Sequence, residues 1–276
     1  MFFIYYTMAK IVQISDLHCS KSRYGKTGFS PAKLNACIKE INRLKPDVVA
    51  VTGDLTMFGF KNEYQMAKRY ISKIESEKLI IPGNHDARYG GYAYYDEYFG
   101  YGNTSLEIPG ISMIGIDTTI PDLDEGNVGR GKLRWLLEKI DEMPADNFKI
   151  VAMHHHLIPV PRTGRERSTI AGGGTVMEAL IIAGVDMVLC GHRHTPYSWL
   201  VNNLAIINAG SVSATKLRAN TTNNYNIIDV ENSSIKAYVK EIGKKPKLMA
   251  QYSKSAESRG LELQQVNYVH TKDPGA

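Results

Sequence analysis

Short apolar segments alternate with amphipathic segments along the first two thirds of the chain. Val48–Val51 is apolar throughout and mostly β-branched, which is typical of a strand that is covered on both faces. Comparable runs predict further strands at Ile11–Ile14, Leu79–Ile81, Ile111–Ile116, Ile150–Met153 and Met187–Cys190. Amphipathic segments between them predict helices at Pro31–Leu44, Asn62–Ser76, Lys132–Met143 and Thr175–Ala183.

The pattern changes after Tyr197, where the predicted helices stop. Short strands are predicted at Leu204–Ile207, Tyr225–Val230 and Ile235–Val239, with Asn-rich turns between them. The chain therefore reads as one α/β domain with a β-rich second half. We place this domain at residues 8–243. Residues 244–276 are predicted to be a C-terminal extension, which is packed over the domain, contacts a partner or is partly disordered.

Composition places the chain among globular proteins of a reducing compartment. It is 43% hydrophobic and 22% charged over 276 residues, with a formal net charge of +5. This modest basic excess suits anionic substrates, but it is too small to indicate nucleic-acid binding by itself. The three cysteines, Cys19, Cys37 and Cys190, lack the spacing of a disulfide framework or a CxxC motif. We therefore predict a cytoplasmic protein.

The start of the chain adds a separate expectation. Residues 1–7 are apolar and aromatic, yet too few to span a membrane, and they lack the basic start and long apolar run of a signal peptide. Met8 directly precedes a good strand, which makes it an alternative start. We therefore expect no membrane partner and regard residues 1–7 as dispensable.

Side chains that can bind metals follow five of the predicted strands. The set consists of Asp16-Leu-His18, Gly53-Asp54, Gly83-Asn-His-Asp86, His154-His-His156 and Gly191-His-Arg-His194. The carboxyl ends of parallel strands are where open α/β sheets place their sites. Each motif alone is weak, since Gly-Asp is common in solvated turns. Five in order, each after a buried strand, predict one shared site.

This set of residue types is suited to a pair of cations. A carboxylate can bridge two metal ions, while imidazole nitrogens and an amide oxygen complete their coordination. Two cations about 3.5–4 Å apart can hold a phosphoryl group and generate a hydroxide at neutral pH. Mixed nitrogen and oxygen donors suit Mn, Fe, Zn, Co or Ni.

The five motifs in this order resemble those of the calcineurin-like metallophosphoesterase superfamily, from residue 10 to about residue 210. The resemblance implies a sandwich of two mixed β-sheets flanked by helices, in four αββα layers. It implies that Asp54 is a carboxylate shared by two metal ions. The implied ligands of one ion are Asp16, His18 and His194, and those of the other are Asn84, His192 and one of the histidines 154–156.

The ligand among histidines 154–156 and the role of Asp86 have alternatives. His154 fits the family register as the ligand, with His155 as the alternative and His156 as a neighbour of the site or a surface residue. His85 resembles the family's non-ligand histidine, which contacts the phosphate and helps the leaving group depart. Asp86 either orients the imidazole of His85 or caps a helix.

A narrower resemblance lies in the middle of the chain and does not by itself fix the substrate. Asp117-Thr-Thr, then Gly126, Gly129, Leu133 and Trp135-Leu136 are similar to a segment of class III cyclic-nucleotide phosphodiesterases, although Arg134 replaces the usual glutamine. The favoured function is hydrolysis of small phosphodiesters, cyclic nucleotides included. The alternatives are a phosphomonoesterase or protein phosphatase, a nuclease, and a non-catalytic scaffold, which the complete ligand set disfavours.

Two predicted loops could set specificity. Residues 89–101 hold six tyrosines, which could stack on a base; we favour a packed cap or a contact in a homodimer. Arg162, Arg165 and Arg167 precede a glycine run and predict a mobile basic loop, which either holds an anionic substrate or is simply solvated.

Overall fold

The computed structural model describes residues 8–21, 28–164, 169–231, 234–254 and 260–267. Arg165 and Arg167, the segment before Met8 and parts of the predicted extension lie outside the described residues. None of the described helices is long and apolar enough to cross a membrane.

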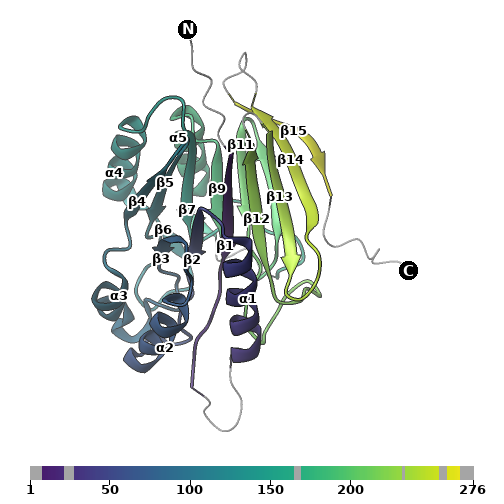
Figure 1. Cartoon of the computed structure of the whole chain (residues 1–276). Coiled ribbons are helices and arrows are strands. Elements are labelled where there is room, and N and C mark those ends of the chain that lie inside the picture. Colours follow the sequence, from purple (N-terminus) through teal and green to yellow (C-terminus); the bar gives the residue numbers. More distant parts are fainter. Residues whose placement is uncertain (1–7, 22–27, 165–168, 232–233, 255–259, 268–276) are drawn as a thin grey trace.

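Two mixed β-sheets form the centre of the molecule (Figure 1). The first has seven strands in the order β15-β14-β13-β12-β1-β2-β3, and the second has six in the order β10-β11-β9-β7-β5-β4. The strands of the first sheet are β1 (Met8–Ile14), β2 (Val48–Thr52), β3 (Glu77–Ile81), β12 (Asn224–Glu231), β13 (Ser234–Glu241), β14 (Lys247–Lys254) and β15 (Leu261–Val266). Those of the second are β4 (Thr104–Ile108), β5 (Ile111–Ile116), β7 (Phe148–Met153), β9 (Met187–Cys190), β10 (Tyr197–Val201) and β11 (Leu204–Asn208). A small parallel pair is formed by β6 (Gly126–Asn127) and β8 (Ile170–Ala171).

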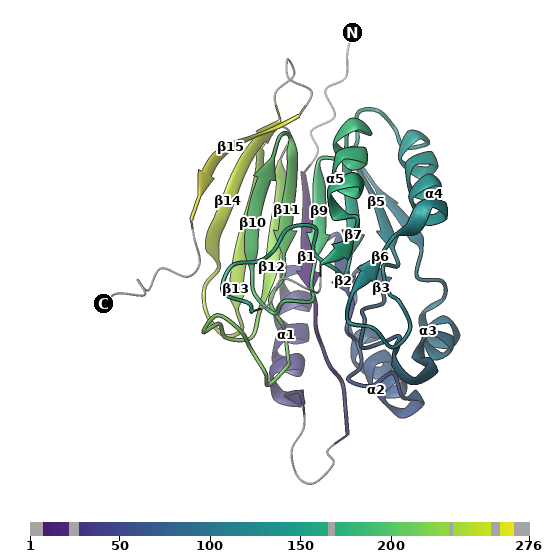
Figure 2. The same cartoon turned by 180° about the vertical axis from the view of Figure 1, so that it is seen from behind.

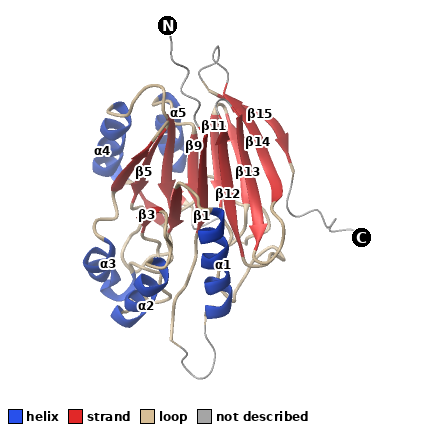
Figure 3. Cartoon of the chain, in the orientation of Figure 1, coloured by secondary structure: helices blue, strands red, loops and turns tan. Residues whose placement is uncertain are grey.

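The helices cover the outer faces of the two sheets, so the predicted four-layer αββα sandwich is confirmed (Figures 2 and 3). On the first sheet, α1 (Pro31–Leu44), α2 (Lys61–Ile71) and α3 (Gly91–Phe99) cover the part formed by β12, β1, β2 and β3. The second is covered by α4 (Gly129–Asp141) and α5 (Gly173–Ile182).

Alternation along β2 shows why these strands are apolar at every position. Val48 and Ala50 point into the core between the two sheets. Val49 and Val51 point the other way, into the core beneath α1 and α2. Because successive side chains of a strand face opposite sides, a strand with a second sheet on one face and helices on the other must be apolar throughout.

Most predicted elements are present, and the sequence places α1 correctly at both ends. Ser30 caps α1, since its side chain accepts a hydrogen bond from the Lys33 amide. The prediction for α2 was too long: the helix ends at Ile71, and β3 already begins at Glu77. The chain must turn between them to lay β3 parallel to β2.

The tyrosine-rich segment was predicted as a loop, which is wrong, because most of it is helix α3. Tyr95 is buried and donates a hydrogen bond to the Ile80 carbonyl, and the ring of Tyr98 stacks on Tyr64 of α2. Tertiary packing of these rings therefore stabilises a helix whose flanking glycines and aromatic residues have modest helix propensity.

The C-terminal residues continue the first sheet. β14 pairs antiparallel with β13, and β15 pairs antiparallel with β14. Met249, Tyr252 and Leu261 from these strands are buried in the core between the sheets. The division of the chain at residue 243 stays a prediction.

Candidate metal centre

The predicted site residues meet at one end of the sandwich, in loops that leave both sheets. Asp16, Asp54 and Asn84 follow β1, β2 and β3 of the first sheet, while His154 and His192 follow β7 and β9 of the second. Hydrogen bonds join the two groups of loops: the His192 amide donates to Asp16 Oδ2 at 3.1 Å, and Nδ1 of His154 lies 2.7 Å from the Thr52 carbonyl. The site therefore exists only when both sheets are packed together.

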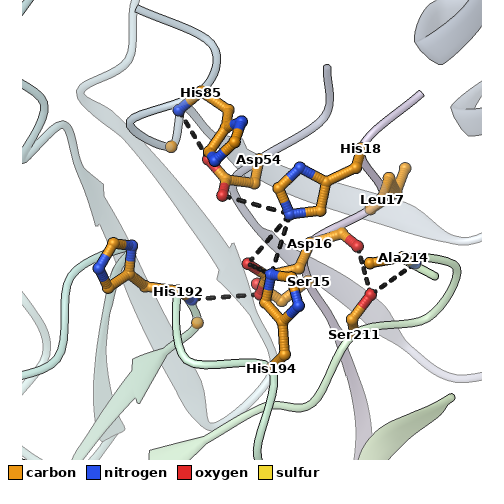
Figure 4. Close-up of polar contacts among 12 residues, drawn as sticks. Ser15, Asp16, Leu17, His18, Asp54, His85, His192, His194, Ser211 and Ala214 are labelled. Atoms are coloured by element: carbon orange, nitrogen blue, oxygen red, sulfur yellow. Dashed lines mark hydrogen bonds and ion pairs between the residues drawn. The ribbon is translucent and has the colours of Figure 1, made fainter. Parts of the chain in front are cut away.

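One cluster contains Asp16, His18, Asp54 and His194, whose donor atoms lie within 4.8 Å of one another. Figure 4 shows these side chains pointing toward a common centre. The Nε2 atoms of His18 and His194 are 2.9 Å apart, and Asp16 Oδ1 is 3.2 Å from Nε2 of His194. Asp54 Oδ2 is 3.5 Å from Nε2 of His18.

The second cluster contains Asp54, His154 and His192, and Asn84 joins it. Asn84 Oδ1 lies 3.1 Å from Nε2 of His154 and 2.9 Å from Nδ1 of His192. The other oxygen of Asp54, Oδ1, is 3.4 Å from Nε2 of His154. Each carboxylate oxygen of Asp54 therefore faces a different cluster, an arrangement in which the carboxylate can serve both.

The three consecutive histidines have different surroundings. His154 faces Asp54 and Asn84, whereas Nδ1 of His155 lies 2.7 Å from the hydroxyl of Thr118. The ring of His156 is buried and stacks on His192. The structure thus brings His154 rather than His155 to the cluster and places His156 behind His192.

Backbone conformation aims these side chains inward. Asp16, His18, Asp54, His192 and His194 all have a positive φ, between 50° and 71°. A left-handed backbone is uncommon outside glycine, and it gathers at functional sites where surrounding contacts hold it in place.

Two glycines let the loops approach each other. A Cβ atom on Gly83 would collide with the Asp54 side chain and amide, and one on Gly53 would lie 2.5 Å from Nδ1 of His154. Gly53 also has a φ of 88°. Replacing either glycine would therefore separate ligands of the second cluster.

The electrostatics of the clusters fit divalent cations. Burial opposes the ionisation of Asp16, yet His194 and His18 hold the pKa of that carboxyl well below its usual range. Burial also opposes protonation of His154, but Asp54 outweighs it and raises the pKa of His154 to about 9. Histidine binds metals in its neutral form. A cation bound beside Asp54 would therefore replace the additional proton on the imidazole of His154. Asp16 Oδ1 is buried and faces Nε2 of His194 at 3.2 Å and Nε2 of His18 at 3.8 Å, without a well-formed hydrogen bond. Together with the nitrogen and oxygen donors, these features fit two divalent metal ions.

The imidazole of His85 lies beside the first cluster without joining it. Its ring meets that of His18 edge-on, with centroids 4.5 Å apart. Nδ1 of His85 is 2.7 Å from the Met57 carbonyl, which leaves Nε2 available to a substrate. Burial lowers the pKa of His85 to about 4, so the ring is neutral near pH 7 in this structure.

The structure corrects both alternatives for Asp86. Its carboxylate accepts hydrogen bonds from the amides of Leu55, Thr56 and Gly83, at 2.8 to 3.0 Å, and from the Thr56 hydroxyl. The carboxylate is therefore hydrogen-bonded to main-chain amides near the ends of β2 and β3 rather than to the imidazole of His85. The residue capping the next short helical turn is Ala87. Asp86 thus holds together the two loops that carry Asp54 and Asn84.

Sequence reasoning missed two groups that support the ligands. The Ser211 hydroxyl donates to the Asp16 carbonyl at 2.6 Å, and Ser213 donates to the Leu17 carbonyl at 2.7 Å (Figure 4 shows the Ser211 contact). These serines follow the buried strand β11, so the rule used for the other loops could have found them. Asp124 accepts from the side-chain amide of Asn84 and from Arg88. No local pattern marks Asp124, because its partners lie 36 to 40 residues away.

The predicted basic loop is described only in part. Arg162 lines a cavity of about 290 Å³ together with His156, Thr163 and Arg193. The guanidinium of Arg193 donates to the hydroxyl of Thr163 at 2.9 Å.

Two clusters that share one carboxylate should bind two metal ions. Elemental analysis of metal-reconstituted protein should approach two ions per chain. His194→Ala removes a donor of the first cluster alone and should reduce that value toward one, as should His192→Ala in the second cluster. A saturating value near one for the unaltered chain would contradict the dinuclear assignment.

Comparison with known proteins shows that the chain is similar to phosphoesterases. The family model described as calcineurin-like phosphoesterase matches residues 9–196. The chain is 31% identical over 218 residues to a probable glycerophosphodiester phosphodiesterase of Arcobacter nitrofigilis, covering 74% of this chain and 78% of that protein. It is 26% identical over 198 residues to a cAMP/cGMP dual specificity phosphodiesterase of Mycobacterium tuberculosis, covering 67% and 61%.

Solved structures share the fold at low sequence identity. A purple acid phosphatase from yellow lupin seeds has a TM-score of 0.69 at 13% identity, over 92% of this chain and 55% of that one. A dimetal phosphatase from Danio rerio has a TM-score of 0.63 at 10% identity, over 87% and 98%.

Proposed function

The chain belongs to the calcineurin-like phosphoesterase family and is a metal-dependent phosphoric ester hydrolase. On that premise, we propose that it cleaves small phosphodiesters, cyclic nucleotides included. The observation that carries the proposal is the pair of donor clusters joined by the two oxygens of Asp54. When bound, two divalent cations would polarise the phosphoryl group and activate water. The donor types suit Mn, Fe, Zn, Co or Ni.

The residues of the chain have separate roles in this proposal. Asp16, His18 and His194 would hold one cation, and Asn84, His154 and His192 the other, with Asp54 shared. His85 would contact the phosphate through Nε2, since Nδ1 is engaged by the Met57 carbonyl. An anionic phosphate beside this imidazole would raise the pKa of His85 and so prepare the ring to donate a proton to the leaving oxygen.

The charges around the site favour a diester over a monoester. A monoester is a dianion near neutral pH and would need additional fixed cations beside the metal ions. Arg88 lies 3.0 Å from Nδ1 of His85, but its guanidinium is paired with Asp124 at 2.5 Å. Arg193 lies between two proposed ligands, and it bonds to Thr163. Arg88 and Arg193 are therefore both engaged by other groups of the protein.

The names of the relatives support the same substrate class. They include phosphodiesterases of glycerophosphodiesters and of cyclic nucleotides. The segment from Asp117 to Leu136, which resembles class III cyclic-nucleotide phosphodiesterases, agrees with this. The three cysteines are buried and free, which supports a reducing compartment; the cytoplasm stays a prediction, as does a homodimer.

The substrate class can be tested by direct comparison. We expect a higher kcat/KM for a nitrophenyl phosphodiester and for 2′,3′- or 3′,5′-cyclic AMP than for the nitrophenyl monoester, with each metal added back in turn. A monoester preference of about tenfold or more under every metal, about 1.4 kcal/mol in transition-state binding, would reject the proposal and favour a phosphatase.

A further inference from the structure

Three exposed aromatic side chains lie in contact beside the proposed catalytic histidine. Phe58, Phe60 and Tyr89 are 39%, 36% and 67% exposed. The ring of Phe60 is 5.5 Å from that of Tyr89 in a stacked arrangement, and 5.8 Å from that of Phe58. We call these three residues the aromatic shelf. Single exposed apolar residues are ordinary, but a contiguous apolar patch marks a binding surface.

The shelf is fixed in position relative to His85. Met57 immediately precedes the shelf, and its carbonyl oxygen lies 2.7 Å from Nδ1 of His85. Gly59, between the two phenylalanines, has a φ of 71°, and a Cβ atom there would collide with the Arg88 carbonyl. The loop that carries Phe58 and Phe60 is thus packed directly against the loop that carries His85 and Tyr89.

Backbone hydrogen bonds hold the phenylalanines on this loop. The Phe58 amide donates to Glu63 Oε2 at 2.8 Å, and the Gly59 amide donates to the Thr56 hydroxyl at 3.2 Å. That hydroxyl in turn donates to Asp86. One chain of contacts therefore connects the shelf to the carboxylate that braces the metal-binding loops.

Tyr89 is exposed at a conformational cost. Its φ and ψ are 50° and 39°, a left-handed conformation that is rare for an aromatic residue. Its amide donates to Asp122 Oδ1 at 2.7 Å, which holds this conformation in place. Tyr95 and Tyr98 of the same segment pack inward instead. Strain of this kind is retained where function requires it.

We propose that the aromatic shelf binds the planar aromatic substituent of the phosphodiester, so that nucleotide-type substrates are preferred over aliphatic diesters. The inference rests on the proposed function. Because the Met57 carbonyl contacts the imidazole of His85, a phosphate held at that imidazole would bring an ester substituent next to the loop 57–60. Bases stack on aromatic side chains irrespective of their hydrogen-bonding edges, so the shelf would select for a ring without selecting one base.

Matched substrates isolate the contribution of the ring. Adenosine 2′,3′-cyclic phosphate and ribose 2′,3′-cyclic phosphate share the reacting phosphate and both leaving oxygens, and they differ by the base alone. Stacking is worth about 1–3 kcal/mol per base, or about 5- to 150-fold. The unaltered protein should therefore favour the adenosine compound by about this factor in kcat/KM.

Two variants remove rings without disturbing the fold. Tyr89→Gly suits the left-handed backbone, and Phe60→Leu keeps an apolar side chain at the start of α2. Each should lower kcat/KM for the adenosine compound by about fivefold or more and leave the ribose compound within about twofold. Tyr101→Leu is the control, because Tyr101 is also exposed, at 82%, but its ring contacts none of the shelf rings.

The outcomes separate this inference from the proposed function. Hydrolysis of both compounds at equal kcat/KM, or an equal loss for both in the variants, would overturn the shelf assignment and leave phosphodiester hydrolysis standing. If the protein hydrolysed none of the three compounds, namely the adenosine compound, the ribose compound and the nitrophenyl diester, the proposed function itself would be rejected. Sedimentation could also show that the protein is a dimer. If Phe60→Leu dissociated this dimer and left the preference for the adenosine compound unchanged, the shelf would be a contact between copies and the proposal would be overturned.

Discussion

Replacement of Asp54 by asparagine should release most of the bound metal together with the activity. The new side chain would keep the size of the original. Its carbonyl oxygen could still accept the hydrogen bond that the His85 amide donates to Asp54 Oδ1 at 2.9 Å. The change removes the one negative charge that faces both clusters. Loss of a residue outside the coordination shell already costs about 10–100-fold in metal affinity, so loss of the shared ligand should exceed this for both ions.

The measurement is metal content and kcat on the same preparations, after dialysis against a fixed free-metal concentration. Asp141→Asn is the matched control, since Asp141 is an exposed carboxylate at the end of α4. Circular dichroism and a thermal melt of the metal-free proteins would separate metal loss from unfolding. Retention of both ions at unchanged affinity in folded Asp54→Asn protein would refute the bridging role.

His85→Ala should have the opposite pattern, with both ions retained and the rate reduced. His85 lies edge-on to His18 but in neither cluster. General acid–base catalysis typically contributes about 10²–10⁴-fold, and we expect a loss of that size in kcat. The loss should be larger for a diester with an alkoxide leaving group than for a nitrophenyl diester, because nitrophenolate leaves without a proton.

Two observations would contradict this assignment. If His85→Ala lost a metal ion, the histidine would belong to the coordination shell. If the loss in rate were the same for good and poor leaving groups, His85 would bind phosphate without protonating the leaving oxygen. His155→Ala is a useful comparison, because His155 is a buried histidine that contacts Thr118 and lies outside both clusters; in a folded variant the dependence on the leaving group should be unchanged.

Elements with strong local signals were predictable, and those stabilised by distant contacts were not. Ser30 and Pro31 mark the start of α1 by local chemistry, and the structure begins the helix there. The helix α3 has no comparable signal, because Tyr95 and Tyr98 are ordered by partners on β3 and α2. The strands β14 and β15 were also missed, since their burial depends on packing against the second sheet.

The sequence by itself determined the residue types of the candidate metal centre and the edge of the strands at which they lie. Buried strands can be recognised from apolar runs, and the residues directly after each run are plain in the sequence. Only the tertiary structure decided which atoms meet. It divided the ligand-bearing strands between two sheets, directed His154 rather than His155 toward Asp54, and turned Asp86 toward main-chain amides. Such choices depend on left-handed backbone at five of the proposed ligands and on contacts across more than a hundred residues, which no local pattern encodes.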